Sequence, residues 1–239
     1  MAGQLQMTAA AVKREARALA DPVRARTLQG FFRTGVGQYG EGDRMAGLTV
    51  PEQRMIAKAF RLLPLEEIAK LLASEVHEHR LIGLVVLMDQ HKRADAAGRL
   101  ERHHFYLAHL AAVNNWDLVD ATAAAMVGEH LEGNRKLLVR LVRSTNLWER
   151  RIAIVCTFAE LRAGRTALTF EMAEMLLHDK HDLIHKAVGW LLREAGKRDP
   201  EALLAFLRQH YGRIPRTTLR YAIERLEALE RKAWLKGPQ

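Results

Sequence analysis

The sequence predicts an all-α fold, because apolar residues recur at helical spacing, strand-like alternation is nearly absent and helix breakers fall at regular intervals. The segments from Val12 to Ala20, Met55 to Leu63 and Leu219 to Leu229 show this spacing clearly. Prolines stand between such segments, where a first helical turn tolerates the missing N–H. These prolines are Pro22, Pro51, Pro64, Pro200 and Pro215. We therefore expect about a dozen helices joined by short turns.

Cysteine content and hydropathy predict a soluble protein of the cytoplasm. Cys156 is the single cysteine, so no disulfide can form within the chain, and its apolar surroundings predict a buried thiol. The longest apolar run, Leu81 to Met88, is too short to cross a bilayer. Near the N-terminus, Glu15 and Asp21 interrupt any pattern of a transit peptide.

The charge of the chain predicts a polyanionic partner. The formal net charge is +9 and the isoelectric point is near 10.0. A basic surface of this size most often binds nucleic acid. Composition by itself does not separate DNA from RNA or from anionic lipid, and a basic protein with no such partner is the remaining alternative.

An internal repeat is visible in helices that begin with a basic residue followed by small and aliphatic residues. Arg80, Arg151 and Lys186 begin three such stretches, and Asp120 occupies the matching place in a fourth. These four positions are separated by 40, 31 and 35 residues, which is the length of one antiparallel helix pair. We therefore expect a single HEAT-like solenoid domain over residues 1–239, in which the second helix of each pair lines one concave surface.

The repeated basic residues predict a positive groove able to hold a DNA duplex. The alternative is that Arg80, Arg151 and Lys186 are solvated helix starts. Asp120 is the exception in this series, because it is acidic where the other three positions are basic. A carboxylate repels phosphate, so an acidic residue facing DNA would be expected to have a specific function. The simplest alternative reason is that the helix dipole favours an acidic residue in a first turn.

The segment from Asn114 to Asp120, Asn-Asn-Trp-Asp-Leu-Val-Asp, is the most informative of the chain. It resembles the Trp-Asp-x-Val-Asp motif of the AlkD-type bacterial alkylpurine DNA glycosylases. Residues 147–154 resemble the arginine helix of that family, and residues 186–194 resemble its Lys-Ala-x-Gly-Trp-x-Leu-Arg-Glu helix. Residues 39–51 resemble its glycine-rich lead-in to a helix. The resemblance spans most of the chain, and its three downstream motifs are jointly specific.

The resemblance implies a role for individual residues. Asp120 falls on the catalytic aspartate and Arg151 on the catalytic-site arginine. Trp116 and Trp190 fall on the two tryptophans that flank the sugar and phosphate of the lesion. Many relatives have an aromatic residue just before Trp116, where this chain has Asn115, which bears on lesion preference. The resemblance also implies a lesion that stays in the base stack.

The chemistry fits these residue types. Alkylation at N3 or N7 makes a purine cationic, so the base can leave without a general acid. A carboxylate such as Asp120 can stabilise the positive charge that grows on the sugar and can orient the attacking water. The indoles of Trp116 and Trp190 suit a developing cation, and the planar fork of Arg151 suits a phosphate. For either tryptophan taken singly, ordinary core packing is the alternative.

Further cations are predicted to contact DNA phosphates. One cluster surrounds Pro215 near a helix start, where free backbone N–H groups can also bind phosphate. A solvated helix face is the alternative for this cluster. The predicted DNA contacts are Arg80, Lys186, Arg193, Arg213, Arg216 and Arg220.

Two other patterns are weaker. The segment from Gly35 to Gly40 reads Gly-x-Gly-x-x-Gly, but no strand precedes it and no helix opens on it, so we expect a flexible interhelix loop rather than a dinucleotide site. His178, His181 and His185 straddle a turn without a matching ligand cluster elsewhere. We expect a solvated turn or polar residues near phosphate there, with a metal site as the alternative.

The sequence thus predicts a DNA glycosylase that excises cationic N3- or N7-alkylated purines from double-stranded DNA. We expect it to work as a monomer, without metal or organic cofactor, in the bacterial cytoplasm and at the nucleoid when bound to DNA. The alternative is a non-catalytic HEAT-like DNA-binding or scaffold protein. The joint presence of Asp120, Trp116 and Arg151 favours the enzyme.

Overall fold

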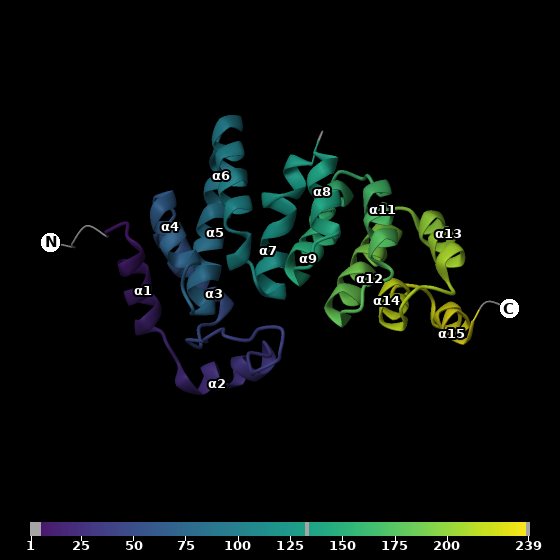
Figure 1. The fold of residues 1–239 in the computed structure, drawn as a ribbon, viewed down its shortest axis with the longest axis horizontal. Coiled ribbons are helices and arrows are strands. Elements are labelled where there is room, and N and C mark those ends of the chain that lie inside the picture. Colours follow the sequence, from purple (N-terminus) through teal and green to yellow (C-terminus); the bar gives the residue numbers. More distant parts are fainter. Residues whose placement is uncertain (1–5, 132–133, 238–239) are drawn as a thin grey trace. The chain divides into compact units, whose positions relative to one another are not determined.

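The computed structural model describes residues 6–131 and 134–237, and it confirms the all-α prediction (Figure 1). Within these ranges there is no strand, and one isolated β-bridge joins Arg44 and Val76. The chain divides between Leu118 and Val119 into two compact units, the N-terminal unit and the C-terminal unit. One continuous repeat domain over residues 1–239 stays a prediction.

The N-terminal unit is built around helix α5, which packs against α1, α3, α4 and α6. Apolar side chains on several sides of α5 are fully buried, among them Ile82, Leu84 and Leu87. A helix that is apolar nearly all round is expected at the centre of its unit. The elements are α1 (Ala9–Ala18), α2 (Pro22–Phe31), α3 (Val50–Ala59), α4 (Leu65–Leu72), α5 (His77–Arg93), α6 (Ala96–Ala108) and the short 3-10 helix η1 (Leu110–Ala112).

The C-terminal unit is built around helix α12, which packs against α9, α11, α13 and α14. Helix α7 (Trp116–Met126) begins in the N-terminal unit and ends in the C-terminal unit. The other elements are η2 (Gly128–His130), α8 (Arg135–Val142), α9 (Leu147–Val155), α10 (Phe158–Arg162), α11 (Ala167–Leu176), α12 (Asp182–Gly196), α13 (Pro200–His210), α14 (Arg216–Ala222) and α15 (Ala228–Lys236).

Local signals explain where many of these helices begin. Pro22, Pro51 and Pro200 lie in the first turn of α2, α3 and α13. Pro64 and Pro215 directly precede α4 and α14. The predicted role of the prolines at helix starts is therefore confirmed, because each stands where no intrahelical N–H bond is lost.

Helices α12 and α14 approach each other closely at Gly189. A Cβ atom on Gly189 would stand 2.5 Å from the Cβ of Tyr221 and 2.6 Å from the carbonyl oxygen of Thr218. Only glycine fits such an approach, which explains the glycine of the Lys-Ala-Val-Gly-Trp segment. In the same unit Cys156 is fully buried, as predicted, and burial raises the pKa of its thiol.

The four repeat positions occupy equivalent places in their helices. Arg80 is the fourth residue of α5, and Asp120, Arg151 and Lys186 are the fifth residues of α7, α9 and α12. This agreement is consistent with a helical-repeat solenoid, whereas the basic groove stays a prediction. Among the residues that the structure describes, no helix has the length and apolar character needed to cross a membrane.

Candidate functional site

Asp120 on α7 and Arg151 on α9 form a bidentate ion pair within the C-terminal unit. Arg151 Nε donates to Asp120 Oδ1 and Arg151 Nη2 donates to Asp120 Oδ2, both at 2.8 Å. The third nitrogen, Nη1, donates to the carbonyl oxygen of Leu183 at 2.5 Å. The side chain of Arg151 is 6% exposed, and that of Asp120 is 22% exposed. The buried arginine therefore fixes the orientation of a carboxylate that still reaches solvent.

This pair bears on the role that the sequence predicts for Arg151, which stays a prediction. A fork that was expected to hold a phosphate is filled by the Asp120 carboxylate, because carboxylate and phosphate offer a guanidinium the same two-point geometry. All three guanidinium nitrogens are engaged within the chain. The geometry favours Arg151 as a residue that positions Asp120.

The two candidate tryptophans are both half-buried. Trp116 opens α7, one helical turn before Asp120, and its ring stacks on Phe32 with centroids 5.4 Å apart. Trp190 on α12 packs against Phe158 with centroids 5.9 Å apart. Each indole is thus partly packed and partly exposed, so neither is an ordinary core residue.

Two of the cations predicted to contact DNA, Arg80 and Arg193, form ion pairs within the chain and have side chains at most 20% exposed. Arg80 is 3% exposed and donates to Asp43 Oδ1 at 2.6 Å. Arg193 forms ion pairs with Glu194 and Glu224. A buried, paired arginine is poorly placed to reach a phosphate, so the geometry favours a structural role for Arg80, and its DNA contact stays a prediction.

The other predicted DNA contacts keep accessible side chains. Lys186 is half-exposed and forms an ion pair with Asp182 at 2.8 Å, one turn earlier on α12. The remaining three are exposed and lie at or just before α14; they are Arg213, Arg216 and Arg220. These four cations stay candidates for phosphate contacts.

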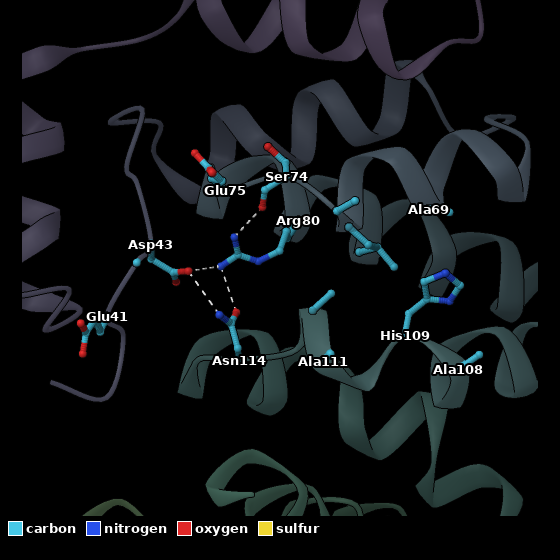
Figure 2. A pocket seen from close by; sticks show the side chains of 14 residues that line it. Glu41, Asp43, Ala69, Ser74, Glu75, Arg80, Ala108, His109, Ala111 and Asn114 are labelled. Atoms are coloured by element: carbon cyan, nitrogen blue, oxygen red, sulfur yellow. Dashed lines mark hydrogen bonds and ion pairs between the residues drawn. The ribbon is translucent and has the colours of Figure 1, made fainter. Parts of the chain in front are cut away.

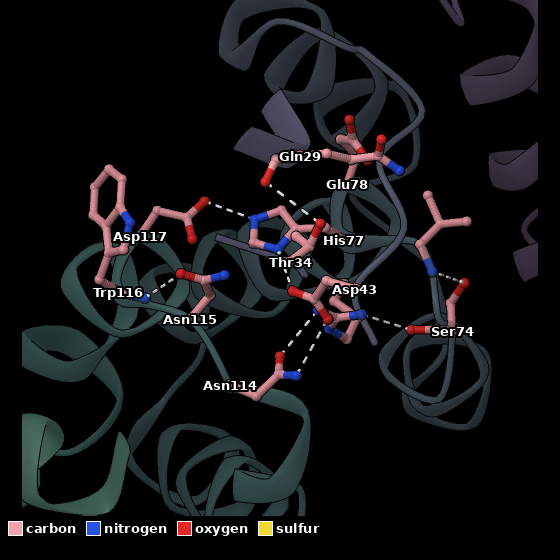
Figure 3. Close-up of polar contacts among 12 residues, drawn as sticks. Gln29, Thr34, Asp43, Ser74, His77, Glu78, Asn114, Asn115, Trp116 and Asp117 are labelled. Atoms are coloured by element: carbon pink, nitrogen blue, oxygen red, sulfur yellow. Dashed lines mark hydrogen bonds and ion pairs between the residues drawn. The ribbon is translucent and has the colours of Figure 1, made fainter. Parts of the chain in front are cut away.

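A buried polar network in the N-terminal unit holds the segment that leads into α7 (Figure 3). His77, the first residue of α5, lies between two carboxylates: Nδ1 is 3.1 Å from Asp43 Oδ2, and Nε2 is 2.8 Å from Asp117 Oδ2. Arg80 bridges Asp43 and Asn114, donating to Asn114 Oδ1 at 2.9 Å. The network therefore ties α5 and the loop before α3 to the start of α7.

The two carboxylates make His77 a cation at neutral pH. Burial by itself would lower the pKa of His77, but hydrogen bonds with Asp117 and Asp43 outweigh burial and raise the pKa to about 9. Burial would raise the pKa of Asp43, yet the hydrogen bond with His77 and the charge of Arg80 hold it below its usual value. Two cations thus face two carboxylates in a buried, charge-balanced cluster.

We expect the free energy of unfolding to fall as the pH rises from about 6.5 to above 9. The pKa of folded His77 lies above its ordinary value of 6.5, so its stabilisation is fully present below pH 6.5 and is lost as the pH passes about 9. A shift of this size corresponds to about 3 kcal/mol. Urea unfolding at pH 6.5 and pH 9.5 measures this fall in the free energy of unfolding. In His77→Gln, the difference between the two pH values should be much smaller than in the wild type.

The other shifted histidines act in a different pH range. The pKa values of His79, His91, His181 and His210 are lowered, each with burial as the largest cause, so they affect stability only below about pH 6.5. Among the shifted histidines, only His77 therefore acts between pH 6.5 and 9. The buried Cys156 thiol, whose pKa is raised from 9.0, also lowers stability near and above pH 9, but it does so equally in the wild type and in His77→Gln. If the free energy of unfolding of His77→Gln fell as much between pH 6.5 and pH 9.5 as that of the wild type, this pH dependence could not be assigned to His77.

Asn115 stands where the resemblance led us to expect an aromatic residue. It is fully buried, and its Oδ1 accepts a hydrogen bond from the Trp116 N–H at 2.9 Å. A side chain so placed supports the start of α7.

Of this network, only Arg80 was among the predicted site residues, and it was predicted to contact DNA. Asp43 and Asn114 do lie in segments that carry the family resemblance, so a signal for them existed. His77 offered none, because its two partners are 34 and 40 residues away in the sequence. Such pairings depend on how the helices pack.

An open cleft of about 670 Å³ lies beside Arg80 in the N-terminal unit (Figure 2). Much of its wall consists of small apolar side chains, such as Ala69 and Ala111. Its polar lining residues are already bonded within the chain: Arg80 and Asn114 to Asp43, Ser74 to His79, Glu75 to Arg44, Glu41 to Gly37 and His109 to Phe105. The cleft therefore offers no free reactive group.

Of the three histidines considered as metal ligands, two make hydrogen bonds at the turn before α12. His181 caps α12 by accepting from the Leu183 N–H at 3.2 Å, and His185 Nε2 is 2.6 Å from the carbonyl oxygen of Asp179. His178 is exposed. Within residues 6–131 and 134–237, no group of three or more His, Cys, Asp or Glu side chains is arranged to hold a metal ion.

Comparison with known proteins adds a family and a fold. Residues 12–226 match the protein family described as DNA alkylation repair enzyme. Among solved structures, the chain is similar to a predicted DNA alkylation repair enzyme from Enterococcus faecalis, with a TM-score of 0.68 and 16% sequence identity. The match covers 94% of this chain and 100% of that one, and at this identity it shows the fold alone. No functionally curated protein matches significantly.

Proposed function

Because the chain belongs to the DNA alkylation repair enzyme family, we propose that it is a DNA glycosylase that excises purines alkylated at N3 or N7 from duplex DNA. The observation that supports this most is the Asp120 carboxylate, which is oriented by a buried arginine and remains partly exposed. Asp120 also lies one turn after Trp116 on α7. An acid held this firmly at an accessible position suits the stabilisation of a cationic transition state.

The proposed reaction breaks the bond between C1′ of the deoxyribose and the alkylated base. The base leaves with the bonding electron pair and becomes neutral, so the positive charge moves to the sugar. Asp120 stabilises this charge and accepts a hydrogen bond from the water that adds to C1′, and the added water loses its extra proton to solvent. The products are the free base and an abasic site, and no general acid is required.

Other residues complete the proposed site. The exposed parts of Trp116 and Trp190 lie against the sugar and phosphate of the damaged nucleotide. Lys186, Arg213, Arg216 and Arg220 contact phosphates, so DNA affinity falls steeply with salt. We propose that the protein works as a monomer and without a metal or organic cofactor.

Release of free base from methylated duplex DNA tests the proposal. We expect chromatography to detect 7-methylguanine or 3-methyladenine, and we expect dialysis against a strong chelator to leave the rate unchanged. Tight DNA binding without base release would instead favour a non-catalytic DNA-binding or scaffold protein. Activity that is lost with the chelator and restored by zinc would contradict the cofactor-free mechanism.

Arg151→Lys should lower the single-turnover excision rate by roughly ten- to a hundredfold, because lysine keeps the charge but not the fork that orients Asp120. DNA affinity should change little, since the fork is occupied by Asp120 rather than by a phosphate. A matched control is Arg150→Lys, which alters the neighbouring ion pair with Asp179. Loss of affinity at an unchanged excision rate would assign Arg151 to phosphate binding instead.

A further inference from the structure

An open cleft of about 670 Å³ lies between helices α13 and α15 in the C-terminal unit (Figure 1). None of the residues predicted to act on DNA is among the described residues that line it. We call it the α15 cleft; its principal lining residues are Arg208, Leu229, Lys232, Ala233, Trp234 and Lys236.

Four of these residues lie on one face of α15. Leu229, Lys232, Ala233 and Lys236 follow the spacing i, i+3, i+4 and i+7, and all four are exposed. Leu229 is 83% exposed, and the half-buried indole of Trp234 lines the same cleft. An apolar surface that is bordered by charged residues is the kind that marks an interaction site.

Three cations border the apolar part of the cleft without a counter-charge. Arg208, Lys232 and Lys236 are exposed, and in the described part of the chain none of them forms an ion pair. The described residues that line the cleft include no Asp or Glu. Lys232 and Lys236 are also four residues apart on α15, a spacing at which like charges destabilise a helix. An anionic ligand would relieve this repulsion.

Helix α15 is held in place mainly through its backbone, because it has no buried residue. The Tyr211 hydroxyl donates to the carbonyl oxygen of Trp234 at 2.9 Å, and Arg216 Nη2 donates to that of Leu235 at 2.6 Å. The rings of Tyr211 and Trp234 also pack with centroids 6.0 Å apart. The exposed side chains of α15 are therefore not needed to hold the helix, and they remain available to a partner.

The size and chemistry of the cleft fit an acidic peptide. A volume of about 670 Å³ lies within the range of ligand sites and accommodates a few side chains. Protein interfaces combine an apolar centre with a polar rim. An aliphatic or aromatic side chain would cover Leu229 and Trp234, while carboxylates would bind the three cations.

Two other partners fit less well. The phosphates of a DNA duplex could meet the cations, but a DNA backbone has no apolar side chain to cover Leu229. A second copy of this chain would carry the same net charge of +9, so the two copies would repel each other. We propose that the α15 cleft binds an acidic segment of another protein that carries a large apolar side chain. This inference is independent of the proposed glycosylase activity.

Fluorescence anisotropy with a short peptide is the first test. The probe is Asp-Glu-Asp-Leu-Asp-Phe, labelled with fluorescein through a glycine spacer, and we expect saturable micromolar binding at low salt. A peptide with Asn and Gln in place of the acids should bind about tenfold more weakly, and so should one with Ala in place of Leu and Phe. Absence of binding by the first peptide, or equal binding by all three, would overturn the proposal.

Variants of the cleft are the second test. Lys232→Gln/Lys236→Gln should weaken peptide binding about tenfold. Leu229→Ala should do the same at an unchanged Tm, because this side chain is 83% exposed. The matched control, Arg225→Gln/Arg231→Gln, removes the same charge from exposed residues outside the cleft and should leave binding nearly unchanged. An equal loss in the lysine variant and in this control would indicate general charge attraction and would overturn the proposal.

The indole N–H signals of the four tryptophans locate the bound peptide by NMR. We expect the peptide to shift the signal of Trp234, which Trp234→Phe assigns, and to leave the signals of Trp116 and Trp190 unchanged. A peptide that shifted Trp116 or Trp190 instead would be bound at the candidate site for DNA, and this would overturn the proposal.

The last test separates the peptide from DNA and from a second copy of the chain. Lys232→Gln/Lys236→Gln should keep wild-type affinity for a duplex that contains a tetrahydrofuran abasic analogue. A loss of DNA affinity as large as the loss of peptide affinity would assign the cleft to DNA, and a wild-type dimer that this variant dissociates in sedimentation experiments would assign it to a second copy. Either result would overturn the proposal. Failure of the wild-type chain to release alkylated bases would remove only the proposed function.

Discussion

Asp120→Asn should lower the single-turnover rate of 7-methylguanine excision by roughly tenfold to a hundredfold. The substitution keeps the shape of the side chain but removes the charge that stabilises the sugar cation. The base already carries a positive charge and leaves partly unaided, so the effect should fall in the lower part of the range for one electrostatic stabiliser. DNA affinity should hold or rise slightly, because a charge that repels phosphate is gone.

The matched control for Asp120→Asn is Asp179→Asn. Asp179 also pairs with an arginine of the C-terminal unit, Arg150, at 2.6 Å, and its side chain is 6% exposed. Its loss should therefore reduce stability while leaving the excision rate of the folded protein unchanged. Wild-type excision by Asp120→Asn would remove the catalytic assignment and make a non-catalytic DNA-binding protein the better interpretation.

Asp43→Ala should produce the largest loss of stability, about 3–5 kcal/mol, because it leaves buried positive charge without its partner. Arg80 is 3% exposed and its Nε already has no hydrogen-bond partner. His77 would keep only Asp117 as a counter-charge. Urea unfolding at neutral pH measures the change in the free energy of unfolding.

Two further variants separate this effect from ordinary ion-pair loss. Asp89→Ala breaks the exposed pair between Asp89 and Arg93 and should cost less than about 1 kcal/mol. Adding Arg80→Met to Asp43→Ala should recover part of the lost stability, since an apolar side chain replaces the uncompensated cation. A similar small cost for Asp43→Ala and Asp89→Ala would show that the buried cluster is not a source of stability.

The network also connects stability to the proposed activity. Phe32 stacks on Trp116 and lies 4.8 Å from the ring of His77, centroid to centroid. Asp117, which His77 holds, follows Trp116 directly on α7. Variants of Asp43 or His77 that still fold should therefore displace Trp116 and slow excision without a matching loss of DNA affinity.

The sequence by itself determined the helices and the identity of the candidate acid. Prolines at helix starts are signals contained within a few residues, and they act through the backbone N–H groups of that same stretch. The repeat spacing likewise placed Arg80, Asp120 and Arg151 near equivalent positions of their helices. Signals of this kind can be recognised in the sequence because residues that are close along the chain interact in the same way regardless of the tertiary fold.

Only the tertiary structure decided what the charged side chains at those positions do. A basic residue near a helix start has the same local sequence whether it faces DNA or a buried acid. Arg80 meets Asp43 from 37 residues away, and Arg151 meets Asp120 from 31 residues away. Both pairings arise because helix packing excludes water from the arginine, and a buried cation is stable only beside a carboxylate. Neither partner could be read from residues close in the sequence.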